Sequence, residues 1–88
     1  MNLDIYVSNH CTNCAEALLI AELARTIAGL QVTVINLDQP GQHIPPRVIA
    51  VPTYVLNSKV FSLGNPEREQ FLTMLRTELM QQRKEEVH

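Results

Sequence analysis

A long apolar segment between two short strand-like runs is the feature that most restricts the fold of this 88-residue chain. Residues 3–7 and residues 31–37 are both rich in strand-forming side chains. Between them, the segment from Thr12 to Ala28 is apolar over most of its circumference, and Gly29 is a suitable helix terminator. Two strands joined by a buried helix of this length form a right-handed βαβ unit with parallel strands.

The middle of the chain predicts a loop followed by a β-hairpin. Residues 38–47 are rich in proline, so we expect a loop with at most a short helix near Arg47. Residues 53–56 and 59–63 are strand-like, and the polar pair Asn57-Ser58 between them is typical of a tight hairpin turn.

A final helix is predicted after Gly64, with Asn65 as its N-cap and Pro66 at its first position. Its apolar face has four members, namely Phe71, Leu72, Leu75 and Leu79. The charged end, about residues 82–88, is expected to fray. The order βαβ-loop-ββα therefore predicts an α/β fold, in which residues 1–88 form one domain with a four-stranded mixed sheet and two helices.

Composition excludes several classes of function. A net charge of −2 gives no reason to expect nucleic acid or an anionic membrane as a partner. With no Trp, two Tyr and two Phe, the chain has little to offer as a base-stacking platform. No apolar run approaches the ~18 residues of a membrane span, and the first residues have no basic leader. We therefore expect a cytoplasmic protein that does not span a membrane.

The sequence Cys11-Thr12-Asn13-Cys14 lies between the first strand and the first helix. Two cysteines this close together cannot link distant elements, which excludes a structural disulfide framework. The unpaired N–H groups at a helix N-terminus stabilise a thiolate, the reactive form of cysteine. We expect Cys11 at the helix cap as the exposed nucleophile. Cys14, one turn further in, is then suited to resolving a mixed disulfide.

Two alternatives to redox chemistry stay open for this pair. The cysteines can be small core residues without a reaction. They can also be half of a zinc site, or of a metal-linked dimer, for which His10, His43 and His88 are the available further ligands. His10 directly precedes Cys11, where an imidazolium would lower the pKa of the neighbouring thiol. The alternative for His10 is a plain surface residue. We favour redox chemistry and expect no metal.

The motif Cys11-Thr12-Asn13-Cys14, followed by Val51-Pro52-Thr53, resembles the thioredoxin and glutaredoxin family over essentially the whole chain. The closest resemblance is to its short glutaredoxin-like microbial members. It implies a thioredoxin-like fold whose second helix is shortened or missing between residues 38 and 51. It also implies that Pro52 is cis and faces the cysteines, and that Val51 offers backbone hydrogen bonds to an extended substrate. By itself, the sequence says only that Pro52 precedes a strand, where a trans proline is also tolerated.

The sequence departs from the family at positions that serve proton transfer and glutathione binding. Thioredoxins have a buried Asp on the first strand and a Lys on the second, whereas Ile5 and Val34 stand at those positions here. The usual proton relay is therefore expected to be absent. Glutaredoxins bind glutathione with a Lys before the motif and a Thr before the cis-proline, where this chain has residues 8–10 (Ser-Asn-His) and Val51. Glutathione is therefore not the expected partner.

The resemblance implies a thiol–disulfide oxidoreductase that reduces protein disulfides, acts as a monomer and depends on an external reductase. It needs no bound cofactor, since the two thiols carry the electrons. Ile49, Val51 and Leu63 form either an apolar rim for a protein loop or ordinary core. The alternative function is a thioredoxin-fold binding or regulatory module with a non-catalytic or redox-sensing pair, which the apolar Ile5 and Val34 favour.

Overall fold

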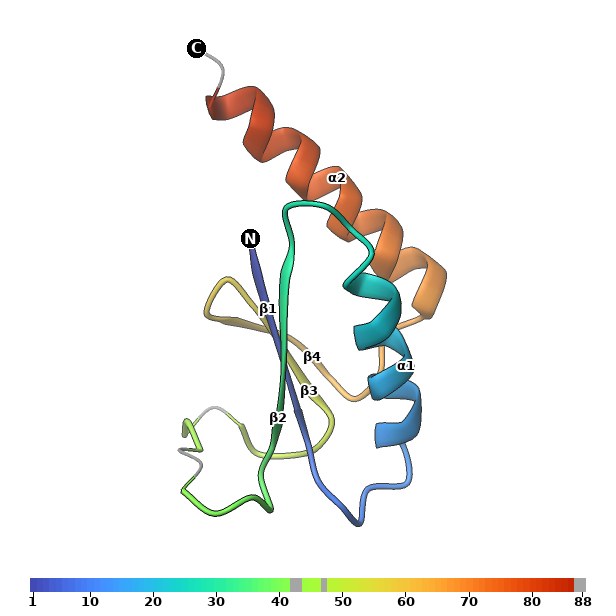
Figure 1. Ribbon diagram of the computed structural model, residues 1–88, viewed down its shortest axis with the longest axis vertical. Helices are drawn as coiled ribbons and strands as arrows, with labels where there is room; N and C mark the ends of the chain where they lie inside the picture. The colour runs from blue at the N-terminus through green and yellow to red at the C-terminus, as the bar shows by residue number, and fades with distance from the viewer. Residues whose placement is uncertain (42–43, 47, 87–88) are drawn as a thin grey trace.

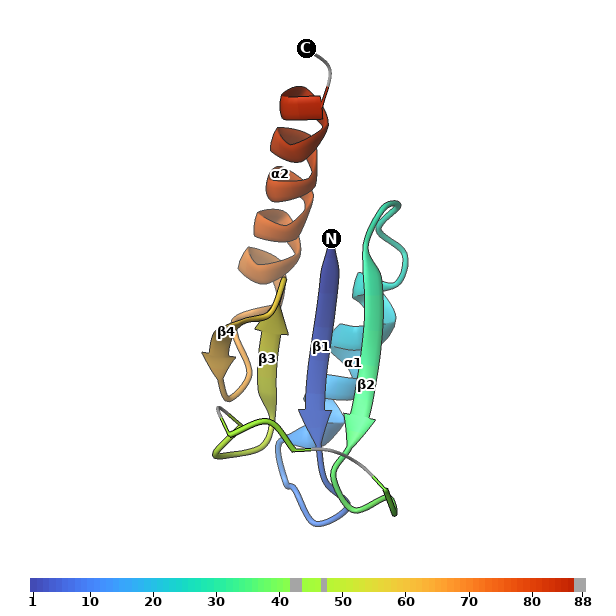
Figure 2. The ribbon, with the colours of Figure 1, turned by 90° about the vertical axis from the view of Figure 1, so that its left-hand side faces the viewer.

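The computed structural model describes residues 1–41, 44–46 and 48–86, and these form four strands and two helices (Figure 1). In chain order the elements are β1 (Asn2–Val7), α1 (Cys14–Ala24), β2 (Gln31–Asn36), β3 (Thr53–Leu56), β4 (Lys59–Leu63) and α2 (Arg68–Glu86). The strands lie in the order β2-β1-β3-β4, as Figure 2 shows. β1 is parallel to β2 and antiparallel to β3, and β3 is antiparallel to β4. The predicted α/β fold with a mixed sheet is confirmed.

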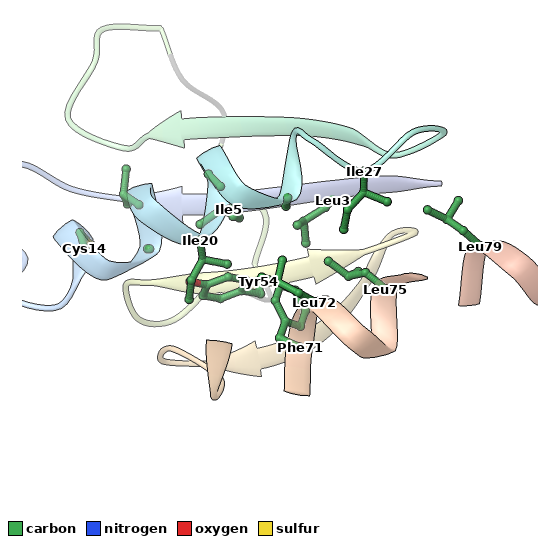
Figure 3. Packing of buried hydrophobic residues seen from close by; sticks show 14 residues of the cluster. Leu3, Ile5, Cys14, Ile20, Ile27, Tyr54, Phe71, Leu72, Leu75 and Leu79 are labelled. Atoms are coloured by element: carbon green, nitrogen blue, oxygen red, sulfur yellow. The ribbon is translucent and has the colours of Figure 1, made fainter. Parts of the chain in front are cut away.

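Both helices lie on the same side of the sheet (Figure 1). The main core forms between them and the strands, because alternate side chains of β1, including Leu3 and Ile5, point to this face. Figure 3 shows these residues beside Ile20 of α1 and Leu75 of α2, and all four side chains are fully buried. The sheet and the helices thus share one hydrophobic layer, which fixes α1 on the sheet.

Part of the other face of the sheet is covered by the segment between β2 and β3. Val48 from this segment packs with Tyr6 and Val55 in a second, smaller cluster. Within the described residues, this segment has no helix and consists of turns and irregular chain. A 2.9 Å hydrogen bond from the Val48 N–H to the Pro45 carbonyl closes one of the turns. The second helix of the thioredoxin-like fold is therefore missing from this part of the chain, as predicted. The short helix expected near residue 47 lies outside the described residues.

The start of α1 differs from the prediction by two residues. The helix begins at Cys14, with Asn13 in the N-cap position, and not at Thr12. The Cys14 N–H donates to the Cys11 carbonyl at 3.3 Å. Thr12 and Asn13 are therefore the central residues of a turn, a conformation that both residue types accept more readily than a helix. As a result, Cys11 lies in the turn before the helix, and Cys14 is its first residue.

α1 also ends earlier than predicted, at Ala24 and not at Ala28. The N–H groups of Thr26 and Ile27 donate to carbonyls three residues back, at 3.2 and 3.0 Å, which is the tighter pattern of a closing turn. The Thr26 hydroxyl donates to the Leu23 carbonyl at 2.6 Å. This side-chain bond competes with continuation of the helix. Gly29 follows with a φ of 86°, which only glycine adopts readily.

The N-cap of α2 is Glu67 and not Asn65, the residue that the sequence predicts. The Glu67 carboxylate, and not Asn65, accepts the free N–H groups of Glu69 and Gln70, at 3.3 and 2.7 Å. Glu67 also carries a negative charge to the positive end of the helix, which stabilises it further. At the other end, the segment expected to fray has a helical backbone as far as Glu86. The last residues of this helix are Gln, Arg, Lys and Glu, all strong helix formers.

The hairpin between β3 and β4 is confirmed with the predicted boundaries. Asn57 and Ser58 have positive φ angles of 49° and 69°, which is the geometry of a tight turn that matches the twist of two antiparallel strands. The Asn57 side chain also accepts the Asn2 N–H at 2.9 Å, which ties the turn to β1. Neither α1 nor the described part of α2 is long and apolar enough to cross a membrane.

Candidate active site

The Cys11–Cys14 pair lies directly after the carboxyl end of β1 and forms a disulfide with a Cα–Cα distance of 5.3 Å. The two residues differ in accessibility. Cys11 is half-buried in the turn, whereas Cys14 is 5% exposed and belongs to the main core cluster. Of the two residues, Cys11 is therefore the more accessible to an incoming molecule.

The Val51–Pro52 segment reaches the same end of the sheet. Thr53 pairs with Tyr6 near the end of β1, so Pro52 lies at the same end of the sheet as the turn that carries the cysteines. The Val51–Pro52 peptide bond is cis. The Gly64 N–H donates to the Pro52 carbonyl at 2.7 Å, which attaches the segment to the end of β4. Val51 packs, half-buried, against the same core cluster as Cys11.

The turn before Cys11 is held to the end of β2 by two hydrogen bonds, and a third orders the segment that accepts it. The Asn9 N–H donates to an Asp38 carboxylate oxygen at 2.7 Å, and the Asn36 amide donates to the Asn9 side-chain oxygen at 2.8 Å. The Asp38 N–H in turn donates to the Asn36 side-chain oxygen at 2.9 Å. His10 has an exposed side chain, and no hydrogen bond or ion pair joins it to another described residue. Its influence on Cys11 stays a prediction.

Asn65 links the cysteine turn to β3. Its side-chain oxygen accepts the Tyr54 hydroxyl at 2.8 Å, and its side-chain nitrogen donates to the Asn13 carbonyl at 2.8 Å. Sequence reasoning missed this contact because it assigned Asn65 to the cap of α2. A signal was present, since a buried tyrosine hydroxyl needs a hydrogen-bond partner.

An ion pair connects the first turns of the two helices. The Arg68 guanidinium donates to both carboxylate oxygens of Glu16, at 3.1 and 2.8 Å. These hydrogen bonds hold the pKa of Glu16 below its ordinary value of 4.5. The pair places the N-terminus of α2 against that of α1, close to the Cys14 end of the disulfide.

Comparison of the sequence with models of protein families assigns the chain to a family. Residues 1–76 match the Thioredoxin_3 model, described as a thioredoxin domain. The chain belongs to the thioredoxin domain family. No curated protein matches it well enough to count as a relative. The match covers β1, both cysteines, the Val51–Pro52 segment and the hairpin, together with the first half of α2.

This thioredoxin domain has an apolar environment where other thioredoxins have their proton relay. Ile5 and Val34 are direct partners in the register of β1 and β2. Ile5 is fully buried in the main core, and Val34 packs against it. Neither side chain can accept or donate a proton.

Two of the three apolar residues predicted beside Cys11 have exposed side chains. Ile49 is 76% exposed and Leu63 is 54% exposed, so neither is ordinary core. Leu63 pairs with Thr53, the residue after Pro52, and Ile49 lies three residues before Pro52. We call Ile49, Val51 and Leu63 the apolar rim of the site.

A metal site would need further ligands around the cysteines. Across residues 1–41, 44–46 and 48–86, no three His, Cys, Asp or Glu side chains come together in a group that can hold a metal ion. His43 and His88, two of the ligands weighed from the sequence, lie outside the described residues.

The Glu16–Arg68 pair gives the thioredoxin domain a pH-dependent contribution to stability. Because the folded-state pKa of Glu16 is lowered, the contribution is present above about pH 4.5 and is lost as the pH falls through that lowered pKa. Replacing Glu16→Gln is expected to reduce the melting temperature slightly at about pH 7 and to have less effect at about pH 2.5. Thermal unfolding followed by circular dichroism measures both differences. An equal difference at the two pH values would contradict the assignment.

Proposed function

We propose that this thioredoxin-domain protein is a thiol–disulfide oxidoreductase that reduces disulfides in protein substrates through Cys11 and Cys14. The proposal rests on the cysteine pair at the N-terminus of α1. The two cysteines are at disulfide distance, and one is more accessible than the other. A half-buried first cysteine suits the attacking thiol, and a buried second cysteine suits the resolving thiol.

The proposed reaction has two exchange steps. The Cys11 thiolate attacks one sulfur of the substrate disulfide, forming a mixed disulfide and releasing the other substrate sulfur as a thiolate. Cys14 then loses its proton to water or to that thiolate and attacks the Cys11 sulfur, which releases the second substrate thiolate. The substrate disulfide gains two electrons and two protons, and the protein dithiol becomes the Cys11–Cys14 disulfide. An external dithiol reductase restores the reduced protein, and no bound cofactor takes part.

Helix α1 is expected to favour the thiolate in the reduced protein. Its first N–H groups have no acceptor within the helix, and they lie where Cys11 and Cys14 are held. Their partial positive charge stabilises an anion and lowers the pKa of a nearby thiol. This effect does not need His10, which is the further candidate modulator.

A protein substrate is favoured by the surroundings of the cysteines. Among the described residues, the Val51 N–H and C=O have no hydrogen-bond partner, so both are free to pair with an extended peptide. The exposed Ile49 and Leu63 offer apolar contact on either side of that segment. Glutathione would leave this rim largely uncovered, and Val51 stands where glutaredoxins have a threonine. We further propose that the protein works as a monomer in the cytoplasm, where an external reductase is at hand.

The reduction potential of the cysteine pair tests the proposal. The protein is equilibrated in redox buffers of known poise, and the free thiols are counted. We expect a value near that of reducing thioredoxins, roughly −270 mV. A value near roughly −120 mV would instead indicate an oxidant. A pair that forms no disulfide at any poise would overturn the proposal in favour of a binding or regulatory module, the second candidate, which the apolar Ile5 and Val34 support.

A further inference from the structure

Asn65 is the one described residue whose side chain joins the cysteine motif to the strand that follows Pro52. It comes from the connection between β4 and α2, 52 positions away from Asn13 in sequence. Its partner on the other side, Tyr54, is fully buried in β3. The contact is therefore a bridge between the motif and the core of the sheet.

The direction of the two hydrogen bonds is fixed by chemistry. The Asn13 carbonyl is an acceptor only, so it must face the nitrogen of the Asn65 amide. The Asn65 oxygen then faces Tyr54, whose hydroxyl must donate. Burial raises the pKa of Tyr54, which keeps the hydroxyl protonated as this arrangement requires. Tyr54 thus orients the amide that holds Asn13.

The Asn13 carbonyl belongs to the peptide that leads directly into Cys14. It also accepts the first helical hydrogen bond of α1, from the Ala17 N–H at a long 3.4 Å. The Asn65 amide, at 2.8 Å, is the closer donor. On the other side of the motif, Asn9 is held to Asp38. Residues 10–12, which include Cys11, are therefore the short segment between two fixed points.

We propose that Asn65, oriented by Tyr54, is a positioning residue that keeps Cys14 directed at Cys11 while the disulfide opens and closes. The inference rests on the proposed exchange reaction and adds a residue to it. With Cys14 held, the chain loses little freedom when the disulfide forms, so the effective concentration of one thiol at the other is high. Without the bridge, the internal disulfide is less favoured and the mixed disulfide is resolved more slowly.

The test measures the ratio of the Cys11–Cys14 disulfide to the reduced dithiol in a glutathione redox buffer. This ratio is compared between the variants and the wild type. Replacing Asn65→Asp keeps an oxygen for Tyr54 but removes the donor to Asn13. One net hydrogen bond is worth about 1 kcal/mol, so we expect the ratio to fall about three- to tenfold, a rise of about 15–30 mV in reduction potential. Replacing Tyr54→Phe removes only the hydroxyl and is expected to change the ratio in the same direction by less. It provides the readout should the Asn65 variant not fold.

Arg68→Met is the matched control. It weakens the docking of α2 on α1, through the bond to Glu16, without touching the Asn13 carbonyl. We expect it to lower the melting temperature but to leave the ratio unchanged. A ratio that falls equally in the Arg68 and Asn65 variants would overturn the inference, because helix docking would then be the cause. If the wild-type pair equilibrates normally and the ratio is unchanged in the Asn65 and Tyr54 variants, the inference is overturned. The proposed function would not be affected by that result. A wild-type pair that never oxidises would overturn the proposed function with it.

Discussion

Replacing Cys11→Ser is expected to abolish disulfide reduction, with kcat/KM falling by a factor of about 1,000 or more. A serine hydroxyl is not ionised at neutral pH and cannot form a mixed disulfide. Cys14 cannot substitute, because it is 5% exposed and lies in the main core. The rate is measured as thiol release from a disulfide-bonded model protein with an excess of dithiothreitol.

The Cys14→Ser variant separates the two roles. It keeps the attacking thiol but lacks the resolving one, so the covalent adduct of Cys11 with the substrate is expected to accumulate. Mass spectrometry under non-reducing conditions detects this adduct, and the variant lacking both cysteines is the control that forms none. An adduct formed by the Cys11→Ser variant and not by the Cys14→Ser variant would reverse the roles. A wild-type rate in the Cys11→Ser variant would rule out the mechanism.

The strands were the easiest part of the fold to predict, because their signals are local. Residues 53–56 and 59–63 differ from the surrounding loops in composition, and the Asn57-Ser58 turn has the conformation that its residue types prefer. The helix boundaries were harder. By residue type and position, Asn65 is a good N-cap for α2. In the folded chain its side chain is hydrogen-bonded to Tyr54 and Asn13, and Glu67 is the N-cap.

The position of the cysteine pair could also be predicted, since the motif places Cys11 and Cys14 between a strand and a helix whatever the rest of the chain does. The hydrogen bond and the ion pair around the motif could not be predicted from the sequence. Asn65–Asn13 and Arg68–Glu16 both join residues 52 positions apart. Such pairs depend on how α2 packs against α1, which no local pattern in a single sequence reports. The contacts of polar residues in loops beside a motif are therefore found only in the folded chain.

The packing of α2 against β3 predicts the largest effect on stability. Phe71 is 2% exposed, and its ring meets that of Tyr54 edge to face at a centroid distance of 5.4 Å. Figure 3 shows Phe71 beside Tyr54 and Leu72 in the core. Replacing Phe71→Ala leaves a cavity at this contact and is expected to cost about 3–5 kcal/mol of unfolding free energy. For a domain of this size, the melting temperature should fall by more than about 10 °C.

Phe61→Ala is the matched control for this prediction. Phe61 also contacts the Phe71 ring, at 5.1 Å, but its own side chain is 44% exposed on β4. Removing it uncovers one side of Phe71 without leaving a closed cavity, so we expect a loss of about 1 kcal/mol. Urea unfolding of both variants measures the difference. Equal losses would mean that α2 is held to the sheet mainly at its outer edge. In that case, the buried contact with Phe71 would not be what holds Tyr54 beside Asn65, where Tyr54 supports the cysteine turn.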